Sequence, residues 1–294
     1  MEPLTLPAVF ESADLASLKA QKTYLWLFRG TLLLLIVGAF LGSVSSSSPS
    51  WQHTSRLSSA IILGVSVLLG VTLKLLAPEK SWFGARAVAE SVKSVSWRYA
   101  VGGEPFAMSV EARAADERFN VEVRTILNAK RDLGWNFATV TGGPQITPEM
   151  RAWRGRSMPE RLQLYIEKRV KKQRQWYGDK ATGNGKRHLA WFGIATFAQI
   201  AAVISAIVMI QVTNGPINPT GAFSAISAAA VAWSQMKRHQ DLAQSYGLAA
   251  HELGLIEGEA EHVKTESDLS AFVANAENAI SREHTMWAAR RDVG

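Results

Sequence analysis

A long uncharged stretch constrains this chain more than any other feature of its sequence. Residues 189–236 contain no Asp, Glu, Lys or Arg. Near the middle, residues 213–219 contain one glycine and two prolines. Those residue types end helices, so the stretch divides into segments 189–212 and 220–236. At about 1.5 Å per residue the segments are about 36 Å and about 26 Å long, against a bilayer core of about 30 Å. This pattern is typical of a membrane hairpin, although a buried hairpin of a large soluble helical protein would share it.

A second apolar hairpin favours the membrane. Segments 24–44 and 57–76 are joined by a serine-rich turn. Tyr24 and Trp26 lie where interfacial aromatic residues are expected, and Arg29 can extend to the same interface. The sequence therefore predicts an all-α integral membrane protein whose four transmembrane helices form two hairpins.

The distribution of basic residues predicts the orientation. The formal net charge is +7, and the central segment 80–187 is rich in Lys and Arg. The two short hairpin links carry Arg56 alone. Because cytoplasmic loops carry the excess of Lys and Arg, we expect both termini and the central segment to be cytoplasmic.

Both hairpins would then enter from the same side, which argues against an inverted-repeat transporter. We expect a first two-span unit with cytoplasmic helices at 1–132, a glycine- and proline-rich linker at 133–158, and a second two-span unit at 159–294. Apolar residues from Leu242 to Val263 follow a heptad spacing, which indicates a coiled-coil-like cytoplasmic helical bundle. The last span is a candidate for direct continuation into this helix.

Charged and aromatic residues share one helical face after the second span. They recur every three or four residues from Trp82 to Trp97. Two interpretations stay open, a solvated face with incidental tryptophans and a partly buried polar network against other cytoplasmic helices. The bracketing tryptophans favour the network. Its candidate members are Trp82, Arg86, Glu90, Lys93, Trp97, Arg98, Trp176, Tyr177, Lys180, Tyr246, Glu252, Glu277, Glu283, His284 and Trp287.

Small residues recur every four positions on the last span, where they allow close helix packing, and hydroxyls line one side of the second span. Packing within the chain and the wall of a pore both fit this pattern. No acidic or basic side chain lies at the middle of a span, so a pore would need several copies. The candidate pore or helix-packing residues are Ser59, Ser66, Gly221, Ser224, Ala225, Ala228 and Ala229.

Catalytic and metal motifs fail on inspection. His251-Glu252 opens like HExxH, but Leu255 stands where the second histidine is required. Gly183-Asn-Gly-Lys186 lacks the first glycine and the Ser/Thr of a phosphate-binding loop. The chain has no cysteine, which excludes thiol catalysis and cysteine-based metal sites. We expect a protein that is not an enzyme, with no catalytic, cofactor-binding or metal-binding residues and no cofactor.

The segment WFGARAVAESVKSVSWRY at 82–99, placed after a two-span hairpin, resembles an element of SLATT domains, the SMODS- and SLOG-associating two-transmembrane effectors. The second half is similar to another branch of that family. The residues that carry this similarity are Gln175-Trp176-Tyr177, Ala232-Trp233-Ser-Gln235, Ser245-Tyr246, Phe272-Val273-Ala-Asn275-Ala-Glu277 and Arg282-Glu283-His284-Thr-Met-Trp287. The resemblance implies two such units in tandem.

The resemblance also implies a function: a membrane effector of a bacterial conflict system, coupled to nucleotide second messengers and proposed to form pores. It implies the bacterial inner membrane as the location, and it supplies no catalytic residues. We expect an oligomeric pore-forming or membrane-disrupting effector, gated through its cytoplasmic helices.

Two alternatives stay open. One is a non-conducting adaptor that recruits a soluble partner through its helical stalk. The other is a sensor whose basic residues Arg86, Lys93, Arg98 and Arg187 meet a nucleotide or an anionic lipid. The expected partners are the lipid bilayer, further copies of the chain, and a nucleotide second messenger or a separate sensor protein. We expect no specific nucleic-acid binding.

Overall fold

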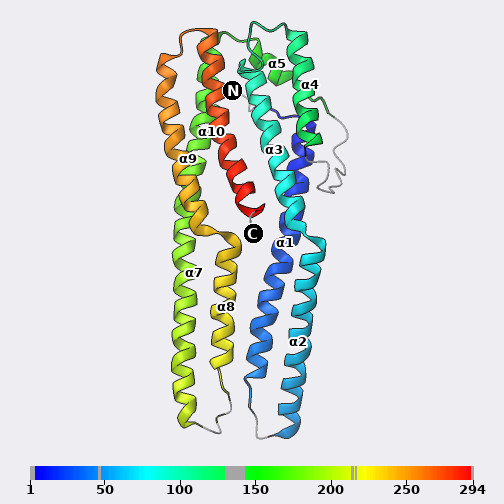
Figure 1. The fold of residues 1–294 in the computed structure, drawn as a ribbon, viewed down its shortest axis with the longest axis vertical. Helices are drawn as coiled ribbons and strands as arrows, with labels where there is room; N and C mark the ends of the chain where they lie inside the picture. Colours follow the sequence, from blue (N-terminus) through cyan, green and yellow to red (C-terminus); the bar gives the residue numbers. More distant parts are fainter. Residues whose placement is uncertain (1–3, 46–47, 130–142, 213–214, 216, 293–294) are drawn as a thin grey trace. The chain divides into compact units, whose positions relative to one another are not determined.

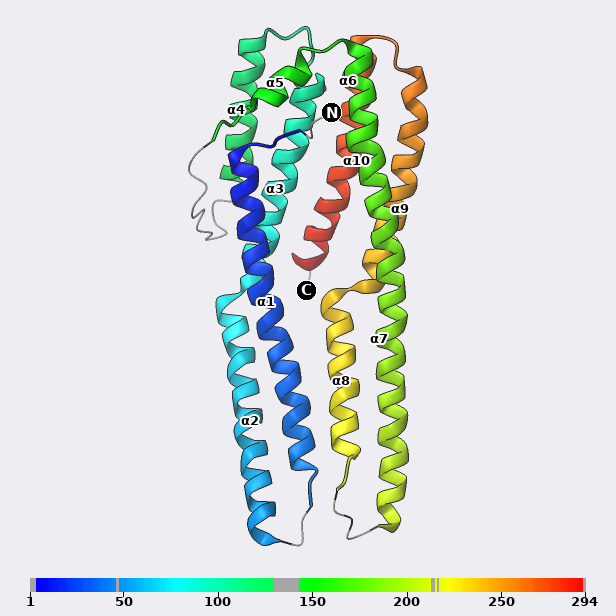
Figure 2. The same ribbon diagram turned by 180° about the vertical axis from the view of Figure 1, so that it is seen from behind.

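The computed structural model describes residues 4–45, 48–129, 143–212, 215 and 217–292, with side chains described as far as Ser281 (Figures 1 and 2). In chain order the elements are α1 (Ala8–Gly42), α2 (Pro49–Leu76), α3 (Pro78–Val101), α4 (Ala112–Asn128), α5 (Pro148–Arg154), α6 (Met158–Tyr165), the π-helical turn η2 (Ile166–Val170), α7 (Lys171–Gln211), α8 (Thr220–Lys237), α9 (His239–Glu259), the 3-10 turn η3 (Ala260–His262) and α10 (Glu266–Asp292). The expected all-α class is confirmed, since the residues that the structure describes include no strand.

The chain divides into two compact units that are each discontinuous in sequence. Unit one contains Met1–Gln21, Glu79–Ala181 and Gln244–Gly294, whereas unit two contains Lys22–Pro78 and Thr182–Ala243. Each unit therefore draws on both halves of the chain. The expected two-span units at 1–132 and 159–294 describe the order of hairpins along the chain and stay a prediction. The expected linker at 133–158 lies partly outside the described residues, and its described part contains α5.

Among the residues that the structure describes, three helices are long and apolar enough to cross a membrane. They are Ala8–Gly42, Pro49–Leu76 and the continuous helix Met158–Gln211, which ends with α7. Helix α8, expected as a fourth span, has 18 residues and is not among them. The three helices suggest a membrane protein, as the sequence predicted.

Helices α1 and α2 pack closely within unit two. Ser59 Oγ donates a hydrogen bond to the carbonyl of Gly38 (2.7 Å), and Ser66 Oγ donates to the carbonyl of Thr31 (2.9 Å). A Cβ atom at Gly38 would lie 2.7 Å from the side chain of Leu63, so glycine is what allows this approach. The two serines predicted on a weakly polar side of the span thus face α1.

Helices α7 and α8 form the other hairpin of unit two. Ser227 Oγ donates to the carbonyl of Ala195 (3.0 Å). The two hairpins meet at their tips, where Val44 and Ile217 form an isolated antiparallel bridge. The Arg29 guanidinium of α1 lies 5.0 Å from the centre of the Trp233 ring of α8, so the hairpins also meet near their other ends.

The core of unit one consists of one face from each of several amphipathic helices. Helix α10 buries Leu269, Phe272, Val273, Ala276 and Ile280, at helical spacing. Helix α9 buries the middle of the heptad pattern, including Leu253, while its flanking positions are packed against the same core. The pattern therefore identified the buried face of α9.

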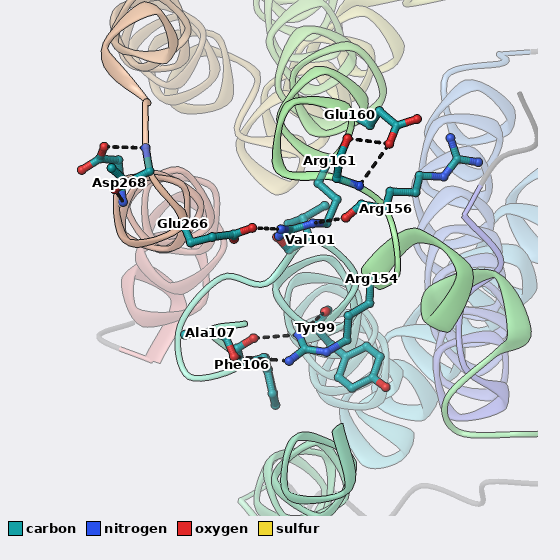
Figure 3. A network of polar contacts seen from close by, with 12 residues as sticks. Tyr99, Val101, Phe106, Ala107, Arg154, Arg156, Glu160, Arg161, Glu266 and Asp268 are labelled. Carbon is teal, nitrogen blue, oxygen red and sulfur yellow. Dashed lines mark hydrogen bonds and ion pairs between the residues drawn. The ribbon is translucent and has the colours of Figure 1, made fainter. Parts of the chain in front are cut away.

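The helix boundaries of unit one follow from capping residues. Thr147 accepts a hydrogen bond from the Met150 amide at the start of α5, and Ser157 with Glu160 forms a capping box on α6. Asp268 accepts hydrogen bonds from two backbone amides before α10 (Figure 3).

Helix α8, which we expected to run on directly into the next helix, does not do so. Arg238 adopts a left-handed conformation, with φ of 51°, and ends α8 before α9 begins at His239. Its backbone amide donates to the Ser234 and Gln235 carbonyls, which closes the last turn of α8. The uncharged stretch ends at Met236 and the heptad pattern begins at Leu242, so neither pattern covers the break at Arg238.

Candidate functional site

A fully buried carboxylate, Glu277, lies at the centre of unit one. It belongs to the apolar face of α10, where an unpaired charge would be costly. Ser94 Oγ donates to Glu277 Oε2 (2.6 Å), and the Tyr165 hydroxyl donates to Oε1 (3.0 Å). The Arg169 guanidinium donates from Nε to Oε1 and from Nη2 to Oε2, both at 2.8 Å. Both oxygens of the buried acid are thus satisfied by three other helical segments.

Two of these donors, Tyr165 and Arg169, lie four residues apart at the π-helical turn η2, so they share one helical face. A π turn inserts an extra residue into a helix and changes the phase of the faces on either side. Tyr165 precedes η2 and Arg169 lies within it, and both side chains reach Glu277. Such turns often occur at functional sites, so this part of unit one is a candidate functional site.

Electrostatics keep the buried pair ionised. Burial alone would raise the pKa of Glu277, but the charge of Arg169 and the hydrogen bonds from Arg169, Ser94 and Tyr165 hold it below the usual value. For Arg169 burial opposes the charge, and Glu277 more than compensates, so its pKa is raised. The pKa of Tyr165 is raised by burial and by the neighbouring carboxylate, so its hydroxyl stays a donor.

A second ionic group lies on α3. Glu90 is 7% exposed and sits between Arg86 Nη2 (2.5 Å) and Lys93 Nζ (3.7 Å). Arg86 also reaches Asp14 of α1 through Nη1 (3.3 Å). Burial lowers the pKa of Lys93, Glu90 opposes this, and the nearby charges of Arg169 and Arg86 lower it further. The structure therefore places Arg86, Glu90 and Lys93 in one partly buried network, as the spacing indicated.

These two ionic groups border one cleft. Its volume is about 270 Å³. Five cationic side chains and one acid line it, together with two tryptophans and a glutamine. The lining residues are Arg86, Glu90, Lys93, Trp97, Lys168, Arg169, Lys172, Gln173 and Trp176. We call this the basic cleft.

The predicted tryptophans have different environments. Trp97 is 6% exposed, and its ring packs edge-on against Trp153 (5.4 Å) and Tyr165 (5.9 Å). Trp97 is therefore mainly a core residue whose edge reaches the cleft.

The Trp176 ring contacts the rings of Tyr177 (5.3 Å) and Tyr246 (5.4 Å), and Lys180 Nζ lies 5.5 Å from its centre. Trp176, Tyr177, Lys180 and Tyr246 thus form one aromatic cluster beside the cleft, at positions that the sequence had singled out.

The remaining predicted network residues lie outside the cleft. Arg98 Nη2 donates to Asn278 Oδ1 (2.7 Å), and the Trp82 ring lies 4.4 Å from that of Phe83. Glu252 lines a separate, open groove between α9 and α10. Three further members have side chains outside the described residues: Glu283, His284 and Trp287.

Two buried arginines near the end of α3 were absent from the predicted network. Arg154 of α5 donates to the carbonyls of Tyr99 (3.1 Å), Phe106 (2.7 Å) and Ala107 (3.3 Å), as Figure 3 shows. Cations are favoured at a helix C-terminus, where carbonyls lack partners within the helix. Arg154 therefore fixes the end of α3 and the loop that follows.

Arg161 of α6 acts at the same end of α3. It is 1% exposed and donates to the carbonyls of Val101 (2.7 Å) and Arg156 (3.0 Å), and it forms an ion pair with Glu266 (Figure 3). These bonds join α3, α6 and the start of α10. Both arginines serve the fold rather than the basic cleft.

The small residues of α8 divide between two faces. Ala229 is buried together with Ala222, Ser227 and Ala230. In contrast, the other predicted members are more open: Gly221, Ser224 and Ala228 are exposed, and Ala225 is intermediate. The buried contact face is therefore offset from the two rows that the sequence spacing suggested.

The chemistry of the site is that of ion pairing and anion attraction. In the described part of the chain no group of three or more His, Asp or Glu side chains could hold a metal ion. The Glu277 network uses its donors internally, whereas the basic cleft presents cations toward its interior. Binding of an anion is what this arrangement can do chemically.

Comparison with protein families found two matches. The model of SMODS and SLOG-associating 2TM effector domain 3 matches residues 7–162. The model of SMODS and SLOG-associating 2TM effector domain 1 matches residues 165–287. No curated protein and no solved structure matched the chain. The two family matches follow one another along the chain and meet near η2.

Proposed function

Because the chain belongs to the SLATT family of two-transmembrane effector domains, which are associated with conflict and defence systems, we propose that it is a bacterial effector that breaches its own membrane. The observation that carries this proposal is the set of three membrane-length apolar helices within two tandem family matches. We assign no catalytic role to the chain and expect no cofactor.

Helix α8 is the fourth span in this proposal. Its small side chains and its packing on α7 suit a short span that neighbours shield from lipid. Large apolar side chains on α7, such as Phe197 at 74% exposure and Ile210 at 77%, suit contact with lipid. In this proposal both termini lie on the cytoplasmic side of the inner membrane, because segments rich in Lys and Arg favour that side.

The active form in this proposal is a homo-oligomer. The serine hydroxyls of α2 are used in bonds to α1, so a single chain offers little polar surface for a conducting path. The exposed small residues Gly221, Ser224 and Ala228 give α8 a face on which a helix of another copy can pack closely. We assign gating to the helices of unit one. Two of them, α1 and the continuous helix Met158–Gln211, run from unit one into a span of unit two.

Loss of membrane potential on expression in bacteria tests this function. A voltage-sensitive dye should report depolarisation with the wild-type chain. Ala228→Leu should suppress depolarisation, because the larger side chain blocks close helix contact. Ala206→Leu, the same substitution at an exposed position of α7, is the matched control and should depolarise normally. An unchanged potential at equal membrane levels of the wild-type chain would contradict the proposal.

A non-conducting adaptor is the second candidate. Leu248 and Leu255 of α9 are 66% and 74% exposed and lie seven residues apart, which gives α9 an apolar face suited to a partner helix. An adaptor would leave the membrane potential intact. Leu248→Ser/Leu255→Ser would then release its soluble partner without any change in conductance.

A further inference from the structure

The charges in the basic cleft are unbalanced. Arg169 is neutralised by Glu277, and Arg86 is paired with both Glu90 and Asp14. In the described part of the chain, no acidic side chain pairs with Lys168 or Lys172 in an ion pair. These two lysines lie four residues apart on the same helix and line the same cleft, so they repel each other.

The opposite wall adds to this positive field. Lys93 lies 3.7 Å from Glu90, which it shares with the closer Arg86. Lys93 is also partly desolvated, with a lowered pKa, and is surrounded by other cations. An anion between the two walls would reduce all of these repulsions at once, and the partial exclusion of water would strengthen its attraction.

The hydrogen-bonding groups of the cleft suit an anion with several oxygens. Glu277 engages Nε and Nη2 of Arg169 and leaves Nη1 for another acceptor. Each lysine ammonium offers three donors, and Gln173 adds an amide. Phosphate oxygens match such donors, and lysine and arginine are common phosphate ligands. The Trp176 ring provides an apolar wall beside them.

We propose that the basic cleft is a binding site for a phosphate-bearing anion, held between Lys93 of α3 and Lys168 and Lys172 of the opposite helix. The volume of about 270 Å³ admits a phosphate or diphosphate group with part of an attached ring or chain. A free nucleotide and a lipid headgroup share this chemistry. This proposal is about anion binding alone, so a binding experiment tests it independently of the proposed breach of the membrane.

Calorimetric titration of the full chain in an uncharged detergent tests the site. The probes are ATP, inorganic pyrophosphate and dihexanoyl-phosphatidylglycerol below its micellar concentration. Lys168→Gln/Lys172→Gln should weaken binding of the preferred probe at least tenfold, since two of the three cations that hold the anion are removed. Saturable binding of ATP or pyrophosphate identifies a free ligand, whereas binding of the lipid alone identifies a headgroup, and either supports the proposal.

The matched control is Lys171→Gln/Arg174→Gln, which removes the same charge from the same helix outside the cleft. It should change affinity less than twofold. Equal weakening by both double variants would reveal a diffuse basic surface and overturn the site, as would the absence of binding by every probe. If the double variant is unstable, the single change Lys172→Gln is measured instead, because Lys172 is exposed and its replacement should leave the thermal midpoint unaltered. Weaker binding by this variant supports the site, and unchanged binding overturns it.

Discussion

The buried pair of Glu277 and Arg169 makes the sharpest prediction about stability. Glu277→Gln keeps the shape of the side chain but removes the charge that compensates the guanidinium. The Gln amide also turns one acceptor into a donor, which then faces the donors of Ser94 or Arg169. Because breaking a buried pair leaves an unpaired charge, we expect a loss of about 3–5 kcal/mol in the free energy of unfolding.

A double-mutant cycle separates the pair from its surroundings. Arg169→Met should cost a similar amount, because it leaves the carboxylate without its counter-ion. Arg169→Met/Glu277→Gln removes both charges and leaves an amide whose oxygen accepts from one of the two hydroxyls of Ser94 and Tyr165, while its NH2 can donate to the other. We expect the double variant to lose about 1–3 kcal/mol, less than either single variant.

Urea unfolding of the full chain in detergent, followed by tryptophan fluorescence, measures these losses. Glu117→Gln is the control, since Glu117 is 69% exposed and its partner Arg113 is 86% exposed. That change should stay within about 0.5 kcal/mol. A Glu277→Gln variant within about 1 kcal/mol of the wild type would refute the claim that a buried charge pair organises unit one.

Three further predictions concern other parts of the chain. Arg154→Met should lower stability by about 3 kcal/mol, because three carbonyls lose their donor, and thermal unfolding will measure it. Gly38→Leu should abolish the α1–α2 contact, and added Leu63→Ala should restore yield of folded protein on size-exclusion chromatography; yield equal to the wild type without Leu63→Ala would contradict the packing. Burial and the hydrogen bond to Asp116 raise the pKa of Tyr99 to about 12, so its contribution to stability is complete below the ordinary value of 10.0 and is lost as pH rises through 12. Tyr99→Phe should remove that part of the alkaline loss in a pH series of unfolding midpoints.

The sequence located the polar face of α3 because charge and spacing there are local properties. Arg86, Glu90 and Lys93 interact within one helix, so helical periodicity was enough to bring them together. Glu277 entered the predicted network through the family resemblance of residues 272–277, and the structure then shows that it lies within an apolar face of α10. An acid in such a position needs a partner, and the partner comes from a different part of the chain.

Arg169 was missed as that partner although a signal existed. It lies in a stripe of apolar and aromatic residues on the helix before α7, where a charge at a core position implies a buried counter-ion. The π turn that directs it depends on tertiary packing, and no local pattern specifies it. Lys168 and Lys172 looked like ordinary surface cations, because only the fold places α3 opposite them.

The short helix α5 escaped prediction for a related reason. The packing of one hairpin on another and the sharing of a core are long-range properties. The order of residues along the chain does not reveal them. Residues 133–158 carry glycine and proline signals of a linker, yet Thr147 and Pro148 begin a helix within them. The buried arginine of α5 is visible only once the end of α3 is placed.

Dye efflux from sealed liposomes tests the central claim most directly. The purified protein is reconstituted into liposomes loaded with a small self-quenching fluorophore. The rate of dye release should rise more steeply than linearly with the protein density, because an oligomeric path requires several copies. Phosphate-bearing anions that bind the basic cleft can be added to the same vesicles. Liposomes that stay sealed across the full range of protein density, with and without these anions, would contradict the account.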